Sequence, residues 1–176
     1  MKKQELTISI LLHTLFIISV YILQGVIFPH IRLAGYVPLL LPVASTGIAL
    51  YEGRHKGGIA GLFAGILCDV SFNQPVGVFT VFLTLAGLIV GTISDTYVLK
   101  GFVTYYIGSA IILAISTFIQ MIPLIISPVQ NVPLQALITT AIQQTIYSLI
   151  LAFPMWFFIH ALGKRTERVS PSGRTY

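Results

Sequence analysis

Glycine recurs at every fourth residue in two stretches of this chain, and the spacing restricts how those stretches can pack. The positions are Gly57, Gly61, Gly65 and Asp69 in GGIAGLFAGILCD, then Gly87, Gly91 and Asp95 in GLIVGTISD. Because four residues make just over one helical turn, each set lies along one face of a helix. A face of glycines leaves a bare groove in which another helix lies backbone to backbone. We therefore predict two helices that each pack unusually closely against a neighbour.

The composition places these helices in a membrane. Hydrophobic residues make up 56% of the 176 residues and charged residues 9%, with a mean hydropathy of +0.92. A soluble domain carries roughly 25% charged residues. The net charge of +5 comes from basic residues scattered over loop ends, so we attribute it to membrane topology and expect no nucleic acid partner. A soluble domain of ordinary size is also excluded.

The chain contains six apolar stretches that we interpret as an all-α bundle of six transmembrane helices. A span needs about 17–25 apolar residues. The expected helices cover residues 6–28, 33–51, 57–72, 76–97, 101–126 and 133–162. The first is longer than the roughly 7–15 apolar residues of a signal peptide, so we expect it to be retained. We divide the chain into a transmembrane domain, 1–163, and a basic tail, 164–176, that we expect to be disordered.

Basic residues predict the orientation of this bundle. With the N-terminus inside, nine of the ten Lys and Arg residues fall in cytoplasmic segments and only Arg32 falls in an outer loop. Basic residues concentrate on the cytoplasmic side of membrane proteins. The bias predicts that both termini are cytoplasmic. Five or seven helices would not give the same asymmetry of basic residues, so six are favoured.

The two aspartates each allow two interpretations. An acid within lipid is costly and is expected to face protein or water. Asp69 is either a buried acid that binds a cation, a substrate or a partner, or a structural cap for the backbone of Ser71, Phe72 and Asn73. Asp95 is either part of such a site or an interfacial charge near Lys100.

Other polar residues give no catalytic pattern. Cys68 is the one cysteine, which excludes an internal disulfide, and we expect it to be a small packed residue. The four histidines lack metal-ligand spacing, and we expect His13 to donate to a neighbouring helix. Motifs such as GxSxG, HExxH and GxxxxGK[ST] are missing. We therefore expect no enzyme activity, cofactor or metal.

A short polar cluster, QQT at residues 143–145, lies within the last apolar stretch. Amides inside the bilayer need hydrogen-bond partners. Two interpretations stay open: a substrate pocket or partner interface, and an internal seam between the last two helices.

The stretch GGIAGLFAGILCDVSFNQPVGVFTVFLTLAGLIVGTISD resembles the signature region of the bacterial rod-shape-determining protein MreD family. The matching features are a glycine-rich helix that ends at Asp69, a turn glycine at Gly77, and a later glycine at Gly87 or Gly91. The resemblance extends to size, six helices and a short basic tail. Outside the signature region it is one of hydropathy alone.

This resemblance implies a non-enzymatic scaffold of the elongation machinery that builds peptidoglycan, located in the cytoplasmic membrane. The implied partners are an MreC-type bitopic protein and, indirectly, the RodA glycosyltransferase, a class B penicillin-binding transpeptidase and the actin-like filament protein. The eight candidate residues for packing and partner recognition are Gly57, Gly61, Gly65, Asp69, Gly77, Gly87, Gly91 and Asp95. The alternative is a vitamin-binding S component of an energy-coupling-factor transporter, whose fold the family resembles. Residues 6–28 lack the alanine-rich face typical of S components.

Overall fold

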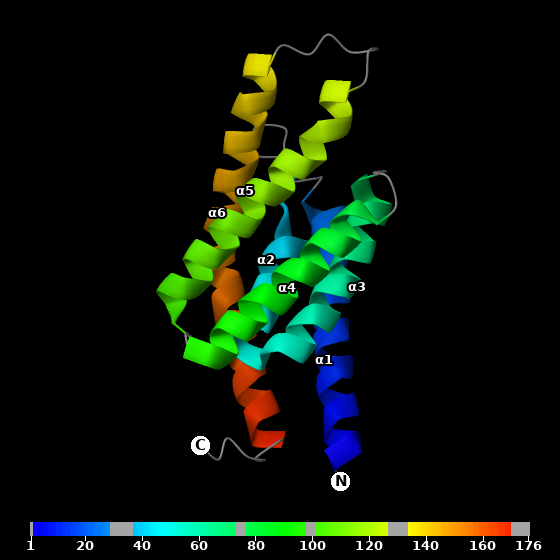
Figure 1. Ribbon diagram of the computed structural model, residues 1–176, viewed down its shortest axis with the longest axis vertical. Coiled ribbons are helices and arrows are strands. Elements are labelled where there is room, and N and C mark those ends of the chain that lie inside the picture. The colour runs from blue at the N-terminus through cyan, green and yellow to red at the C-terminus, as the bar shows by residue number, and fades with distance from the viewer. Residues whose placement is uncertain (1, 29–36, 73–76, 98–100, 127–133, 170–176) are drawn as a thin grey trace.

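The computed structural model describes residues 2–28, 37–72, 77–97, 101–126 and 134–169, and all regular structure in these ranges is helical (Figure 1). A short π-helix, η1, continues the first α-helix. The elements are α1 (Lys2–Ile22), η1 (Leu23–Ile27), α2 (Leu40–Glu52), α3 (Arg54–Phe72), α4 (Val78–Tyr97), α5 (Phe102–Ile126) and α6 (Leu134–Val169). The prediction of an all-α protein with six helices is confirmed.

Of the six transmembrane helices predicted from the sequence, four are confirmed as candidate spans within the described residues. Four segments in the described residues are long and apolar enough to cross a bilayer: Ile10–Ile27, Val78–Tyr97, Phe102–Ile122 and Ile138–Ala161. They belong to α1 with η1, α4, α5 and α6. The helix α3 is not among them, because Arg54 and Lys56 in its first turn and Asp69 near its end interrupt its apolar stretch.

The remaining helix, α2, lies at the centre of the bundle. It has 13 residues, which makes it about 20 Å long, against a hydrocarbon core of about 30 Å. Every residue from Leu40 to Leu50 is buried, and α2 contacts each of the other α-helices. A helix that is apolar all round is stable when it is enclosed. The predicted span 33–51 is thus a short, protein-covered helix.

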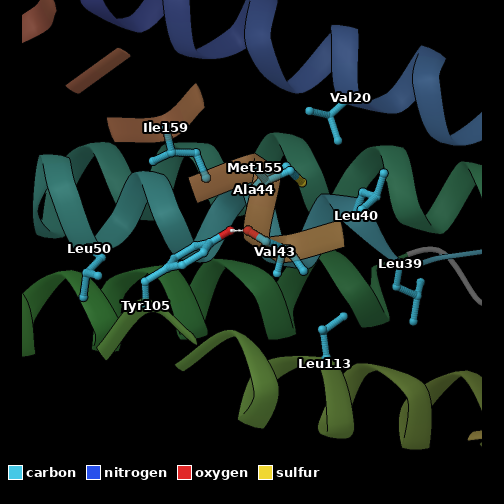
Figure 2. Close-up of a cluster of buried hydrophobic side chains, with 11 residues drawn as sticks. Val20, Leu39, Leu40, Val43, Ala44, Leu50, Tyr105, Leu113, Met155 and Ile159 are labelled. Carbon is cyan, nitrogen blue, oxygen red and sulfur yellow. Dashed lines mark hydrogen bonds between the residues drawn. The ribbon is translucent and has the colours of Figure 1, made fainter. Parts of the chain in front are cut away.

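Side chains of α2 supply two hydrophobic cores. Figure 2 shows one of them, in which α2 residues meet α1, α5 and α6. Its centre includes Tyr105, whose hydroxyl donates to the carbonyl oxygen of Ala152 over 3.4 Å. The second core joins α1, α2, α3, α4 and α5, and contains Ile17, Leu41, Ile48, Ala60, Ala64, Cys68, Phe79, Leu83 and Ile112. These two cores fix the outer helices around α2.

The start of α1 and the end of α6 lie at the same end of the bundle (Figure 1). The predicted boundary between bundle and tail at residues 163 and 164 does not coincide with the end of a helix, since α6 continues to Val169. Residues 164–169 are good enough helix formers to extend a helix that is already nucleated. Residues 170–176 lie outside the described residues.

Candidate functional site: the α3–α4 pair and its aspartate caps

The predicted glycine faces lie against one another in the structure. If Gly57 carried a Cβ, that atom would lie 2.8 Å from the carbonyl oxygen of Gly87 and 2.6 Å from the Cβ of Ala49 on α2. A Cβ on Gly61 would overlap the carbonyl group of Leu83, and one on Gly65 would lie 2.7 Å from the carbonyl oxygen of Phe79. Real Cβ atoms do not approach other atoms so closely, so α3 needs glycine here.

The second stripe fits the same contact from the other side. A Cβ on Gly87 would overlap the carbonyl group of Gly57, and one on Gly91 would lie 2.6 Å from the Cα of Arg54. Thus α3 and α4 run side by side with their backbones in contact, as an antiparallel pair. The groove left by each stripe is therefore filled from within the bundle.

Asp69, near the end of α3, caps the beginning of α4. Its Oδ1 accepts the backbone N–H of Phe79 at 2.9 Å. Its Oδ2 accepts the N–H of Gly77 at 2.9 Å, the N–H of Thr80 at 3.1 Å and the hydroxyl of Thr80 at 2.6 Å. The first N–H groups of a helix have no partner inside it, and Gly77 and Val78 offer no side-chain acceptor.

Of the two interpretations of Asp69, this geometry matches the structural cap, but the donors differ from those expected. They lie eight to eleven residues later in the chain, in place of Ser71, Phe72 and Asn73. The side chain is 4% exposed, and a negative charge at a helix N-terminus is also favoured by the helix dipole. Gly77 has φ +106°, a conformation that favours glycine.

Asp95, near the end of α4, caps the beginning of α3. Its Oδ2 accepts the backbone N–H of Arg54, the first residue of α3, at 2.9 Å. The preceding residue is Gly53, with φ +83°, and a Cβ there would collide with the Asp95 carboxylate. Sequence reasoning placed Asp95 near Lys100, which lies outside the described residues, and did not single out Gly53.

The two aspartates cap the α3–α4 pair at both of its ends. Each helix ends with an acid that caps the first turn of its neighbour, and glycines hold the backbones close between the caps. This explains why both sequence stripes end in aspartate at the same spacing. Asp69 and Asp95 lie at opposite ends of the pair and cannot act on one substrate.

Side chains that the sequence did not single out cap α2. The N-cap residue Leu39 has no capping side chain; instead the N–H groups of Leu40 and Leu41 donate to Oε1 of Gln24 at 2.9 and 3.2 Å. The N–H of Leu39 donates to the hydroxyl of Ser148 over 2.8 Å. At the other end, the hydroxyl of Ser94 donates to the carbonyl of Leu50. The sequence feature that could have indicated this cap is Gln24, an amide within an apolar stretch.

In the polar cluster QQT, Gln144 contacts the backbone before α2 and Thr145 contacts α5. Nε2 of Gln144 donates to the carbonyl of Val37, just before α2, at 3.0 Å. The hydroxyl of Thr145 lies 3.3 Å from that of Thr117 on α5, so the α5–α6 seam exists at this position. Gln143 is exposed.

A comparison with protein-family models gives a match to the family described as rod shape-determining protein MreD, over residues 4–166. This chain belongs to the MreD family. No curated protein and no solved structure matched it. Membership and the apolar helices together make it a multi-pass membrane protein of a family that determines cell shape and is not a known enzyme family.

In this member of the MreD family, the described residues contain no group of three or more His, Cys, Asp or Glu side chains that could hold a metal ion. A groove of about 580 Å³ lies between α4 and α5 and is also lined by Thr46 and Leu50 of α2. Its lining is aliphatic apart from Thr46, Thr104 and Phe82. Sites for small polar ligands carry several convergent polar groups, and this groove does not.

His13 approaches a neighbouring helix, as the sequence led us to expect. Its Nε2 lies 3.4 Å from Oε1 of Glu52, and the side chains of both residues are 7% exposed. Lys56 binds the other carboxylate oxygen. The sequence did not indicate that Glu52 is buried, because it lies between two apolar stretches, where a carboxylate is ordinarily in water.

Proposed function

We propose that this protein is a non-enzymatic scaffold in the cytoplasmic membrane, which supports lateral peptidoglycan synthesis and thereby rod shape. The observation that carries the proposal is the match to the MreD family over nearly the whole chain. The structure is in keeping with it, because the conspicuous polar residues of the α3–α4 pair satisfy backbone groups and leave no reactive centre.

We further propose that the scaffold acts by helix–helix contact with an MreC-type bitopic protein. Through that partner it acts on the RodA glycosyltransferase, a class B transpeptidase and the actin-like filament protein. The glycine stripes face the interior, so their part in partner binding is indirect: they set the shape of the surface presented to lipid. The contact itself falls on outward apolar faces, such as the row Leu85, Ile89 and Ile93 on α4.

Depletion of the protein in its host, followed by microscopy and labelling of new wall material, tests the proposal. We expect rods to widen and become round as lateral insertion is lost, with rescue by the wild-type chain. A depleted culture that keeps its rod shape and its normal pattern of insertion would contradict the scaffold role.

The partner is tested separately by co-purification of the MreC-type protein with tagged wild-type chain. Replacement of Ile89 by Arg is expected to reduce recovery without unfolding the bundle, because the side chain is 58% exposed. Arginine at Ile150, 61% exposed and, like Ile89, near the middle of its apolar span, is the matched control. If both variants recover as much of the MreC-type protein as the wild-type chain does, the row on α4 is not the contact.

A further inference from the structure

Two polar contacts fasten α1 to α2, one near each end of α2. At the start of α2, Gln24 accepts the N–H groups of Leu40 and Leu41. At its end, His13 lies against Glu52. The first contact contains no titratable group, whereas the second pairs an imidazole with a carboxylate. Only the second can respond to pH.

The second contact belongs to a buried cluster of three charged or titratable groups, His13, Glu52 and Lys56. Nζ of Lys56 pairs with Oε2 of Glu52, and Nε2 of His13 faces Oε1. Lys56 is 21% exposed and the other two side chains are 7% exposed. The cluster joins three helices, since His13 is on α1, Glu52 ends α2 and Lys56 lies in the first turn of α3. Ionisable groups buried in a membrane protein are costly and are by default candidates for function.

The charge of the cluster depends on His13. Glu52 and Lys56 balance each other, so a proton on His13 changes the net charge from zero to one positive charge. The carboxylate uses a different oxygen for each partner, and a protonated imidazole can therefore strengthen its contact without displacing Lys56. Hydrogen bonds between ions are about 2.7–2.9 Å long and roughly twice as strong as neutral ones, whereas this contact measures 3.4 Å.

Other charged and titratable side chains near this junction belong to α2, α3 and α6. Among the described residues of the first turn of α3, Arg54 and His55 are exposed, and Tyr51 of α2 packs against His160 of α6. The charged side chains of α1 itself, those of Lys2, Lys3 and Glu5, lie outside the described side chains. On its other flank, α1 borders an apolar hollow of about 370 Å³ shared with α6, lined by Phe16, Val20, Leu151 and Met155 among others. That hollow adjoins α1 from Phe16 onward and not the half of the helix that precedes His13.

We propose that the His13–Glu52–Lys56 cluster is a proton-controlled latch for α1. Protonation of His13 draws the N-terminal half of α1 onto the α2–α3 hairpin. Loss of the proton weakens that contact, while Gln24 keeps the far end of α1 in place. The inference stands on these contacts and does not depend on the proposed scaffold role.

The test uses the full chain in lipid nanodiscs, with nitroxide labels on Leu11→Cys of α1 and Val103→Cys of α5, which are 67% exposed at both positions. The native Cys68 is fully buried and serves as an unlabelled background. Distances between labels are measured by double electron–electron resonance at about pH 5.5 and about pH 8.5, on either side of the usual histidine range. We expect one narrow distribution in acid and a broader, shifted one in base.

Two histidine variants assign the response. His13→Gln keeps a donor but does not titrate, so its distribution should be the same at both pH values. His55→Gln removes an exposed histidine from the same junction and should keep the wild-type response. Glu52→Gln replaces His13→Gln if that variant does not fold. A wild-type distribution that does not change with pH, or a response that persists in His13→Gln, would overturn the latch.

Discussion

At Asp69 one carboxylate accepts four hydrogen bonds from Gly77, Phe79 and Thr80, at the start of α4. The acid is costly to bury, and that cost is offset because it accepts three backbone N–H groups and one hydroxyl in buried or partly buried hydrogen bonds. Asp95 makes a similar contact with Arg54 but is exposed, so water can replace part of what it offers. The two acids have the same spacing from glycine in the sequence, but Asp69 contributes more to the stability of the folded protein than Asp95 does.

Replacement of Asp69 by Asn should lower the free energy of unfolding by about 2 kcal/mol, because an amide leaves buried donors unpaired. The measurement is denaturant unfolding of the purified protein in detergent micelles. Thr92→Ala is the control, since Thr92 is exposed and bonds only within its own helix. An Asp69→Asn variant as stable as the control would contradict the capping role.

At the scale of helices, the bundle depends on acceptors brought from distant parts of the chain. The helices α2, α3 and α4 begin after Leu39, Gly53 and Gly77, none of which has a capping side chain. Their free N–H groups are met by Gln24 and Ser148, by Asp95 and by Asp69. Backbone groups inside a membrane must be satisfied by protein, so α2 and α4 depend on their neighbours for caps that are buried or partly buried. The helix α3, capped by the exposed Asp95, depends less on its neighbour.

The close α3–α4 contact predicts that alanine at Gly61 destabilises the protein, although alanine ordinarily favours a helix over glycine. Gly61→Ala should lower the melting temperature, with overpacking of about 1–3 kcal/mol that exceeds the gain in helix propensity of about 1 kcal/mol. At Gly108 a Cβ would lie 3.7 Å from Thr46, an ordinary contact, so Gly108→Ala should be neutral or stabilising. Equal melting temperatures for the two variants would argue against backbone contact.

The cap on α2 gives a second prediction at this scale. Gln24→Leu should reduce the free energy of unfolding by about 1–3 kcal/mol, because two buried N–H groups lose their acceptor. Gln143→Leu, an exposed glutamine on α6, is the matched change and should have little effect. The comparison is made by chemical denaturation of both variants in the same detergent.

For the whole molecule, local pattern in the sequence predicted the helical class and close packing along each glycine stripe. It did not predict that the two stripes pack against each other. It did not reveal that α2 is enclosed, because apolar residues look the same whether protein or lipid covers them. The pairing of Gln24 with Leu40, or of His13 with Glu52, depends on how helices meet in space. Hydropathy carries no such information, so these contacts required the structure.

The common end of α1 and α6 makes the topology testable. Fluorescent protein fused to either terminus should fluoresce, and alkaline phosphatase at the same positions should stay inactive, because the basic residues predict a cytoplasmic location. Activity of phosphatase at either end would reverse the orientation. Fusion within residues 127–133, between α5 and α6, should give the opposite pattern and serves as the control.

The enclosed position of α2 has a consequence for biosynthesis. A ribosome makes α2 long before α6, yet Ser148, which accepts the N–H of Leu39, and Gln144, which binds the carbonyl of Val37, belong to α6. Unsatisfied backbone groups are not stable against lipid. The nascent second helix must therefore be sheltered by the insertion machinery or a chaperone until translation of the final helix is complete.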